Sequence, residues 1–140
     1  MIEVKNLTKR YGSNVAVDNI SFTVQEGEIV GFLGPNGAGK STTMNILTGY
    51  LSASEGDVSI NGFDILENPN EAKKQIGYLP ELPPLYQDMT VKEYLNFMYD
   101  LKQVTIARKE HIEEICRLVQ ITNVYTRLIR NLSKGYRQRV

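Results

Sequence analysis

The chain has 140 residues, the length of one ordinary domain, and its 16 lysines and arginines balance its 16 aspartates and glutamates. This balance gives no overall electrostatic field that would favour nucleic acid or an anionic membrane as a partner. A single cysteine, Cys116, excludes an internal disulfide and a cysteine-based zinc site, and no apolar run approaches the roughly 18 residues of a membrane-spanning helix. We therefore expect a chain that works in a reducing, cytosolic compartment and has no nucleic-acid partner.

The first segment predicts two half-buried antiparallel strands. Residues 2–7 and 20–24 alternate apolar with polar side chains, and a turn region lies between them at 11–14. Tyr11 stands in this turn, and pattern alone favours an ordinary turn aromatic. Its place upstream of a glycine-rich segment keeps a second role open, as a platform on which a base could stack.

The most informative segment is that glycine-rich stretch. It matches the P-loop pattern G-x-x-x-x-G-K-[ST], and it has the flanks that the pattern requires: an apolar run at 29–33 that predicts a buried strand, and helix-forming residues at 40–50. Its residues are Gly34, Pro35, Asn36, Gly37, Ala38, Gly39, Lys40, Ser41 and Thr42. The alternative, a turn that merely joins a strand to a helix, explains neither the full motif nor its flanks.

The residue types in this loop suit a phosphate cradle. Its glycines allow backbone angles in which successive N–H groups turn toward one anion, and the following helix directs its unpaired N–H groups to the same point. We expect Lys40 to contact the β- and γ-phosphates of a nucleotide and the Ser41 hydroxyl to bind a bridging Mg²⁺. Thr42 is placed to add a further phosphate contact.

Beyond the loop, strand patterns give way to helical ones. We predict a strand at 57–62, a short helix at 70–74 and a strand at 75–79, followed by a proline-rich loop that marks a boundary. Capping-box spacing from Thr90 to Glu93 opens one helix, and a second has apolar residues on one face: Ile112, Ile115, Cys116 and Val119. The predicted organisation is a first domain at 1–85 and a helical subdomain at 86–140.

The last segment, residues 127–140, is basic and contains no acidic side chain. Alone, such a run is typical of a solvated basic helix face or an anion-binding tail. Ser133 is a good N-cap residue and Gly135 permits close backbone approach. We therefore predict a helix that begins there and offers a second phosphate-binding N-terminus.

In this order and spacing, Tyr11, the P-loop, the loop at 75–86 and the Leu-Ser-Lys-Gly-Tyr-Arg-Gln-Arg segment at 132–139 resemble the ABC-type ATPases, the nucleotide-binding proteins of ABC transporters. The resemblance covers the whole chain. It implies an α/β fold: a P-loop NTPase (RecA-like) core with an antiparallel β-subdomain, plus a helical subdomain. In this family Tyr11 matches the aromatic that stacks on adenine, and residues 34–42 match the Walker A segment. Ser133 and Gly135 match the signature residues that contact the γ-phosphate of ATP held by the opposite monomer.

The resemblance also implies the function. Such a protein binds ATP and Mg²⁺, forms a homo- or heterodimer of ATP-binding subunits, and couples hydrolysis to an integral membrane permease at the cytoplasmic face of the membrane. Lys40, Glu81 and Ser133 would be its catalytic residues here. Ser41 and Glu81 would hold the metal. Glu81 stands where the family usually has a glutamine that helps to hold Mg²⁺ and the attacking water, so the local charge differs.

The signature segment departs from the usual pattern as well, with Lys134 in place of a glycine and Tyr136 in place of a glutamine. This combination resembles the bacterial exporter branch more than the binding-protein-dependent importers. We find no Walker B segment, so we expect a piece of a longer subunit that ends within the signature helix and has almost no turnover by itself.

Three other interpretations stay open. One is an ABC ATPase that remodels other complexes and has no permease. A second is a P-loop kinase or GTPase, although the guanine-reading Asn-Lys-x-Asp motif is absent. The third is a module that senses nucleotide without hydrolysing it.

Overall fold

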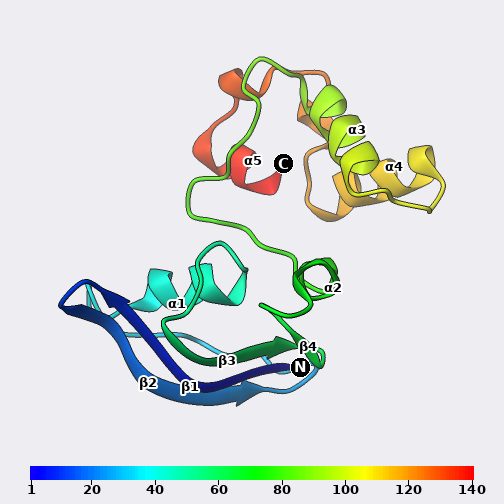
Figure 1. Cartoon of the computed structure of the whole chain (residues 1–140). Helices are drawn as coiled ribbons and strands as arrows, with labels where there is room; N and C mark the ends of the chain where they lie inside the picture. Colours follow the sequence, from blue (N-terminus) through cyan, green and yellow to red (C-terminus); the bar gives the residue numbers. More distant parts are fainter. The chain divides into compact units, whose positions relative to one another are not determined.

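The computed structural model describes residues 1–140 and divides into two compact units, Met1–Tyr78 and Leu79–Val140 (Figure 1). The first unit contains the sheet and two helices, and the second is helical. The division between the units falls earlier in the chain than the boundary predicted after residue 85. Each unit has its own hydrophobic core.

An antiparallel sheet forms most of the first unit. Its four strands lie in the order β2-β1-β3-β4. They are β1 (Ile2–Tyr11), β2 (Asn14–Val24), β3 (Glu55–Ile60) and β4 (Phe63–Asp64). In the central strand, Val4 pairs with Phe22 on one side and with Val58 on the other, and Val4 is buried. The predicted antiparallel pair with its turn is thus confirmed.

Helix α1 (Lys40–Leu47) packs on one face of this sheet (Figure 1). Ile46 and Leu47 enter the same core as the sheet residues, and α2 (Pro69–Lys74) adds Ala72. The apolar residues of α1 are therefore held by tertiary packing, and this packing fixes where the loop before the helix must lie.

Helix α1 ends at Leu47, earlier than the predicted Tyr50. Gly49 has a φ of +69°, and its N–H donates to the Ile46 carbonyl at 2.9 Å. The Tyr50 N–H donates to the Asn45 carbonyl, also at 2.9 Å. These two bonds form a Schellman motif, in which a glycine in the left-handed region turns the chain away from the helix axis.

Two predicted strands are absent from the structure. Residues 29–33 and 75–79 form no strand, and the side chains of Ile29 and Leu33 are 98% and 92% exposed. A buried parallel strand requires a hydrogen-bonding neighbour and apolar cover on both faces. The sheet of this chain consists of β1 to β4 alone and provides no neighbour for either segment. The predictions of a buried strand at 29–33 and of a strand at 75–79 were therefore wrong.

The second unit consists of three helices and two short 3₁₀ turns. They are α3 (Val91–Leu101), α4 (Arg108–Leu118), η1 (Thr122–Val124), η2 (Ile129–Asn131) and α5 (Lys134–Arg139). Cys116 is buried in the core between them, and burial raises the pKa of its thiol. The burial of Ile112 and Cys116 confirms the apolar face predicted for α4.

Candidate functional site

The segment at 34–42 leads into α1, and its last three residues, Lys40 to Thr42, form the first turn of that helix. Gly39 is the N-cap residue, has a φ of +80° and offers no side chain to cap the helix. The first N–H group of the helical ladder belongs to Thr43, which donates to the Gly39 carbonyl at 2.8 Å. The N–H groups of Lys40, Ser41 and Thr42 have no acceptor within the chain. Three backbone donors at the positive end of a helix are thus available to an anion.

The side chain of Lys40 folds back over the loop. Its Nζ donates to the carbonyl of Gly34 at 2.7 Å and to that of Pro35 at 2.8 Å. An ammonium group has three donors, so one remains after these two bonds. The Lys40 side chain therefore ties the beginning of the loop to the first residue of α1.

The loop also lies directly against strand β2. A Cβ atom added to Gly39 would lie 2.3 Å from the Ala16 carbonyl oxygen and 3.1 Å from Val17 Cγ2. No side chain fits at position 39, because the nearest obstacle is backbone. The sequence predicted the conformational freedom of this glycine, and the structure adds the close approach of a strand.

Thr43 was not among the predicted site residues. It is 1% exposed, and its Oγ1 donates to the Gly39 carbonyl at 3.0 Å. Both the backbone N–H and the hydroxyl of Thr43 therefore bind the same N-cap carbonyl. The hydroxyl of a threonine in the first turn of a helix commonly donates to the backbone carbonyl four residues earlier. A threonine at this position of the sequence is therefore the signal that could have identified Thr43.

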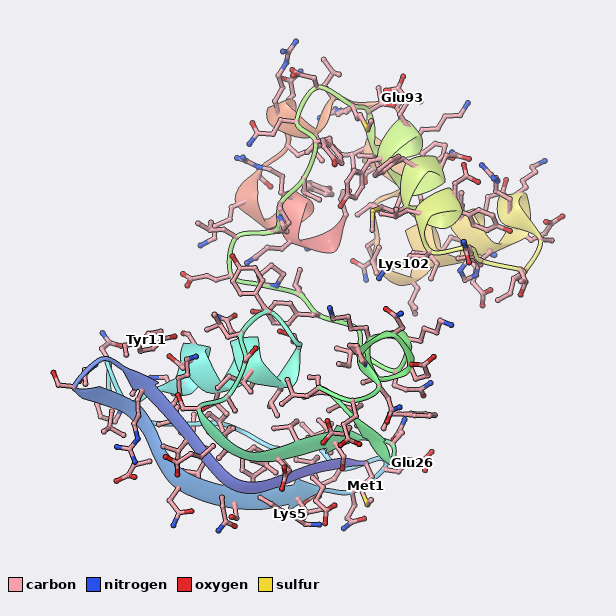
Figure 2. The ribbon with its side chains drawn as sticks, viewed as in Figure 1. Met1, Lys5, Tyr11, Glu26, Glu93 and Lys102 are labelled. Atoms are coloured by element: carbon pink, nitrogen blue, oxygen red, sulfur yellow. The ribbon has the colours of Figure 1, made fainter.

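Tyr11 belongs to the same unit as the loop. It ends strand β1 and pairs across the turn with Asn14, and Figure 2 shows it at the end of the hairpin. Its ring is 48% exposed, and Lys9 Nζ lies 5.3 Å from the ring centroid. The next residues of the hairpin lead to Ala16, the residue that contacts Gly39. An exposed ring on the strand pair that supports the loop is suited to stacking on a base.

The side chains suited to Mg²⁺ are oxygen donors in different parts of the chain. The Ser41 hydroxyl is exposed in the first turn of α1 and is a hard oxygen ligand of the type that Mg²⁺ prefers. Glu81 is exposed in the second unit and forms no ion pair. No group of three or more His, Cys, Asp or Glu side chains that could hold a metal ion occurs in the chain. Of the two predicted metal ligands, only Ser41 belongs to the same unit as the loop.

The signature residues lie at the start of α5, in the second unit. Ser133 is the N-cap, and its Oγ accepts from the Tyr136 N–H at 3.4 Å, which confirms the predicted helix start. Gly135 is exposed, has no positive φ, and a Cβ added to it would meet nothing within 4 Å. Nothing in this chain requires a glycine at position 135, in contrast to position 39.

A glycine-rich loop that carries a lysine, lies at the N-terminus of a helix and belongs to an α/β unit defines a protein of the P-loop class. A model of the family described as ABC transporter matches residues 17–140. The chain belongs to the ABC transporter family, and its fold is that of the family's P-loop cassettes. The predicted family and fold class are thus confirmed.

Curated relatives and solved structures agree with this assignment. The chain is 39% identical over 140 residues to "Uncharacterized ABC transporter ATP-binding protein YhcH" of Bacillus subtilis (strain 168). It is 35% identical over 140 residues to "Bacitracin transport ATP-binding protein BcrA" of Bacillus licheniformis. Each alignment covers 100% of this chain and 45% of the relative, so the chain spans about half the length of these proteins.

One similar solved structure is described as "Dimeric structure of a post-hydrolysis state of the ATP-binding cassette MJ0796 bound to ADP and Pi". It has a TM-score of 0.84 and 26% identity, and the match covers 99% of this chain and 66% of the other. In the present structure, no helix has the length and apolar character needed to cross a membrane.

Proposed function

We propose that the protein containing these residues is the ATP-binding and ATP-hydrolysing subunit of an ABC transporter. The observation that carries the proposal is the loop at 34–42, where an ammonium group and three free backbone N–H groups surround the start of α1. The names of its relatives, which include a bacitracin transport ATP-binding protein, support a role in transport.

In the proposed site, the chain binds the phosphates of ATP chiefly through backbone donors and charge. The N–H groups at the start of α1 and the Lys40 ammonium bind the β- and γ-phosphates, and Tyr11 stacks on the adenine. Ser41 would hold Mg²⁺, and the metal ion would neutralise part of the charge of the phosphates. Because these donors are fixed before binding, little reorganisation is needed when charge develops on the phosphates.

In this proposal, the second unit contacts the nucleotide that is bound by a partner subunit. Ser133 and Gly135 are exposed, and the space beside Gly135 is open to an approaching group. The match to the dimeric cassette bound to ADP and Pi covers 99% of this chain. We infer a head-to-tail dimer in which these two residues face the γ-phosphate held by the loop of the other copy or of a related subunit.

Glu81 and the segment that follows it would link this site to a membrane permease. We propose that Glu81 helps to hold Mg²⁺ and the attacking water, as the glutamine at this position does in the family. Leu82 and Tyr86, within the segment 81–94, are 77% and 56% exposed, and we propose that they contact a permease at the cytoplasmic face of the membrane. We infer that the protein belongs to the exporter branch, and the resemblance of its signature segment to that branch at Lys134 and Tyr136 supports this inference.

The test is Mg·ATP hydrolysis by three proteins: the complete gene product, its Lys40→Ala variant and the 140-residue chain. We expect turnover only in the complete wild-type protein, because removal of a catalytic group typically lowers the rate by about 10²–10⁴-fold. A complete protein that binds ATP but never hydrolyses it, even with its membrane partner, would refute the ATPase proposal and favour a nucleotide sensor.

A further inference from the structure

We propose that Tyr136 and Asn123 form a positioning pair that sets the orientation of α5 and thereby the placement of Ser133 and Gly135. The proposal rests on the proposed contact of Ser133 and Gly135 with a nucleotide held by a second subunit. It assigns a role to Tyr136, which stands where the signature segment usually has a glutamine.

Tyr136 is held at both ends of its side chain. Its ring packs against the core of the second unit, and its hydroxyl oxygen accepts a hydrogen bond from Asn123 Nδ2 at 2.9 Å. Asn123 belongs to η1, the short turn after α4. The guanidinium of Arg139 lies over the same ring, 5.5 Å from its centroid. Tyr136 therefore ties α5 to an element that belongs to the core of the unit.

The same residue supports Ser133 through its backbone. The Tyr136 N–H donates to Ser133 Oγ, so the serine oxygen acts as an acceptor within the chain. The hydroxyl hydrogen of Ser133 remains available to donate to an anionic oxygen outside the chain. A rotation of α5 that displaced Tyr136 would move this donor as well.

Few other hydrophobic contacts hold α5 in place. The helix has six residues, none of them fully buried, and Tyr136 is its only hydrophobic residue that packs against the core. Leu132, just before the N-cap, is buried and anchors the start of the helix. Because Leu132 fixes only the start of the helix, the bond between Tyr136 and Asn123 determines the direction of the helix axis.

The test uses the complete gene product and a non-hydrolysable ATP analogue. Dimerisation is measured by sedimentation, and nucleotide binding by each subunit is measured separately by titration below the dimerisation concentration. We expect Tyr136→Phe and Asn123→Ala each to lower the dimerisation affinity by about two- to tenfold for each signature segment in the dimer. This is the effect expected from the loss of one hydrogen bond per subunit. Nucleotide binding by the single subunit should not change, because the loop lies in the other unit.

Two matched variants distinguish positioning from a merely structural role. Asn123→Asp should restore dimerisation, because the Tyr136 hydroxyl can donate to the new carboxylate. The double variant Tyr136→Phe with Asn123→Ala should be no weaker than either single variant, because both remove the same bond. This rescue and this non-additivity in dimerisation would not arise from a general loss of stability.

Several results would overturn the proposal. Tyr136→Phe and Asn123→Ala proteins that melt earlier but dimerise like the wild type would show that the pair only stabilises the fold. Weakened dimerisation that Asn123→Asp fails to restore would show that the bond itself is not responsible. A wild-type protein that binds the analogue and never dimerises would refute the dimer in the proposed function, and with it this proposal.

Discussion

At the scale of single residues, the start of α1 depends on a position that has no side chain. Gly39 combines a φ of +80° with a backbone contact so close that a Cβ would lie 2.3 Å from the Ala16 oxygen. Gly135 has neither feature. The two glycines therefore serve different purposes: one is required by the fold, and the other leaves space at the surface.

We predict that Gly39→Ala lowers the free energy of unfolding by about 1–3 kcal/mol, because the left-handed backbone is strained with a side chain and the strand must move. Urea unfolding of the complete gene product measures this change. Gly135→Ala is the matched control and should not lower the unfolding free energy, because position 135 is helical and has space for a methyl group. A Gly39→Ala protein with wild-type stability would contradict the contact between the loop and β2.

The contact at Gly39 also marks a limit of prediction from sequence. The P-loop pattern was sufficient to predict Lys40, Ser41 and the glycines as site residues, because the motif is local. The approach of Ala16 depends on the path of β2 and on how α1 packs on the sheet, and no local pattern encodes either. The same is true of the bond between Asn123 and Tyr136.

At the scale of elements, helix α3 has a complete capping box. The Thr90 N–H and hydroxyl donate to Glu93 Oε2 at 2.7 and 2.8 Å, and the Glu93 N–H donates to Thr90 Oγ1 at 3.2 Å. Figure 2 shows Glu93 at the start of the helix. These bonds satisfy donors that would otherwise be unpaired at the helix start.

We predict that Thr90→Ala destabilises the second unit by about 1 kcal/mol, the usual cost of removing an N-cap side chain. Thermal unfolding followed by circular dichroism measures the loss. Thr126→Ala, an exposed threonine outside the helices, is a suitable control. Equal stability of the wild type and Thr90→Ala would show that the cap does not matter.

The same capping box predicts a pH dependence. The backbone hydrogen bond from Thr90, followed by the bond from its hydroxyl, lowers the pKa of Glu93 below the usual value of 4.5. A group whose pKa is lowered by folding stabilises the protein above its unfolded pKa, and this stabilisation is lost as the pH falls through the folded pKa. Glu93→Gln should therefore melt below the wild type at neutral pH, with a difference that shrinks under acid conditions below pH 4.5. A difference that stays constant over this range would contradict the ionised cap.

Local signals explain which elements were predicted correctly. The α3 start was visible as Thr-x-x-Glu spacing, and the β1–β2 pair was visible as alternation, because each depends on neighbouring residues. Residues 29–33 looked like a buried strand on composition alone. Strand formation there depends on a hydrogen-bonding neighbour from a distant part of the chain, and apolar composition does not reveal whether one is present.

At the scale of the whole molecule, the chain exposes apolar residues of the two segments predicted as strands. Ile29 and Leu33 are almost fully exposed, and Leu79 is 62% exposed. Phe32 is the exception in its run, with its ring 5.7 Å from that of Phe22. Exposed apolar residues of this size bind other apolar surfaces or dyes.

We predict that the isolated 140-residue chain binds a hydrophobic fluorescent dye and that Ile29→Ser combined with Leu33→Ser reduces this binding. In the complete gene product, the same double substitution should instead lower the unfolding temperature, because we expect those side chains to be covered there. Dye fluorescence and thermal unfolding measure the two effects. Absence of dye binding by the isolated chain would contradict the exposure of this surface.

The central claim is that the loop at 34–42 binds the phosphates of ATP through Lys40 and the start of α1. The measurement that tests it most directly is a calorimetric titration of the complete gene product with Mg·ATP, beside Lys40→Ala and the exposed-surface control Lys109→Ala. We predict tight binding by the wild type and by Lys109→Ala, and about ten- to hundredfold weaker binding by Lys40→Ala, as the loss of a charged hydrogen-bond donor implies. Equal affinity of Lys40→Ala and the wild type would contradict the account.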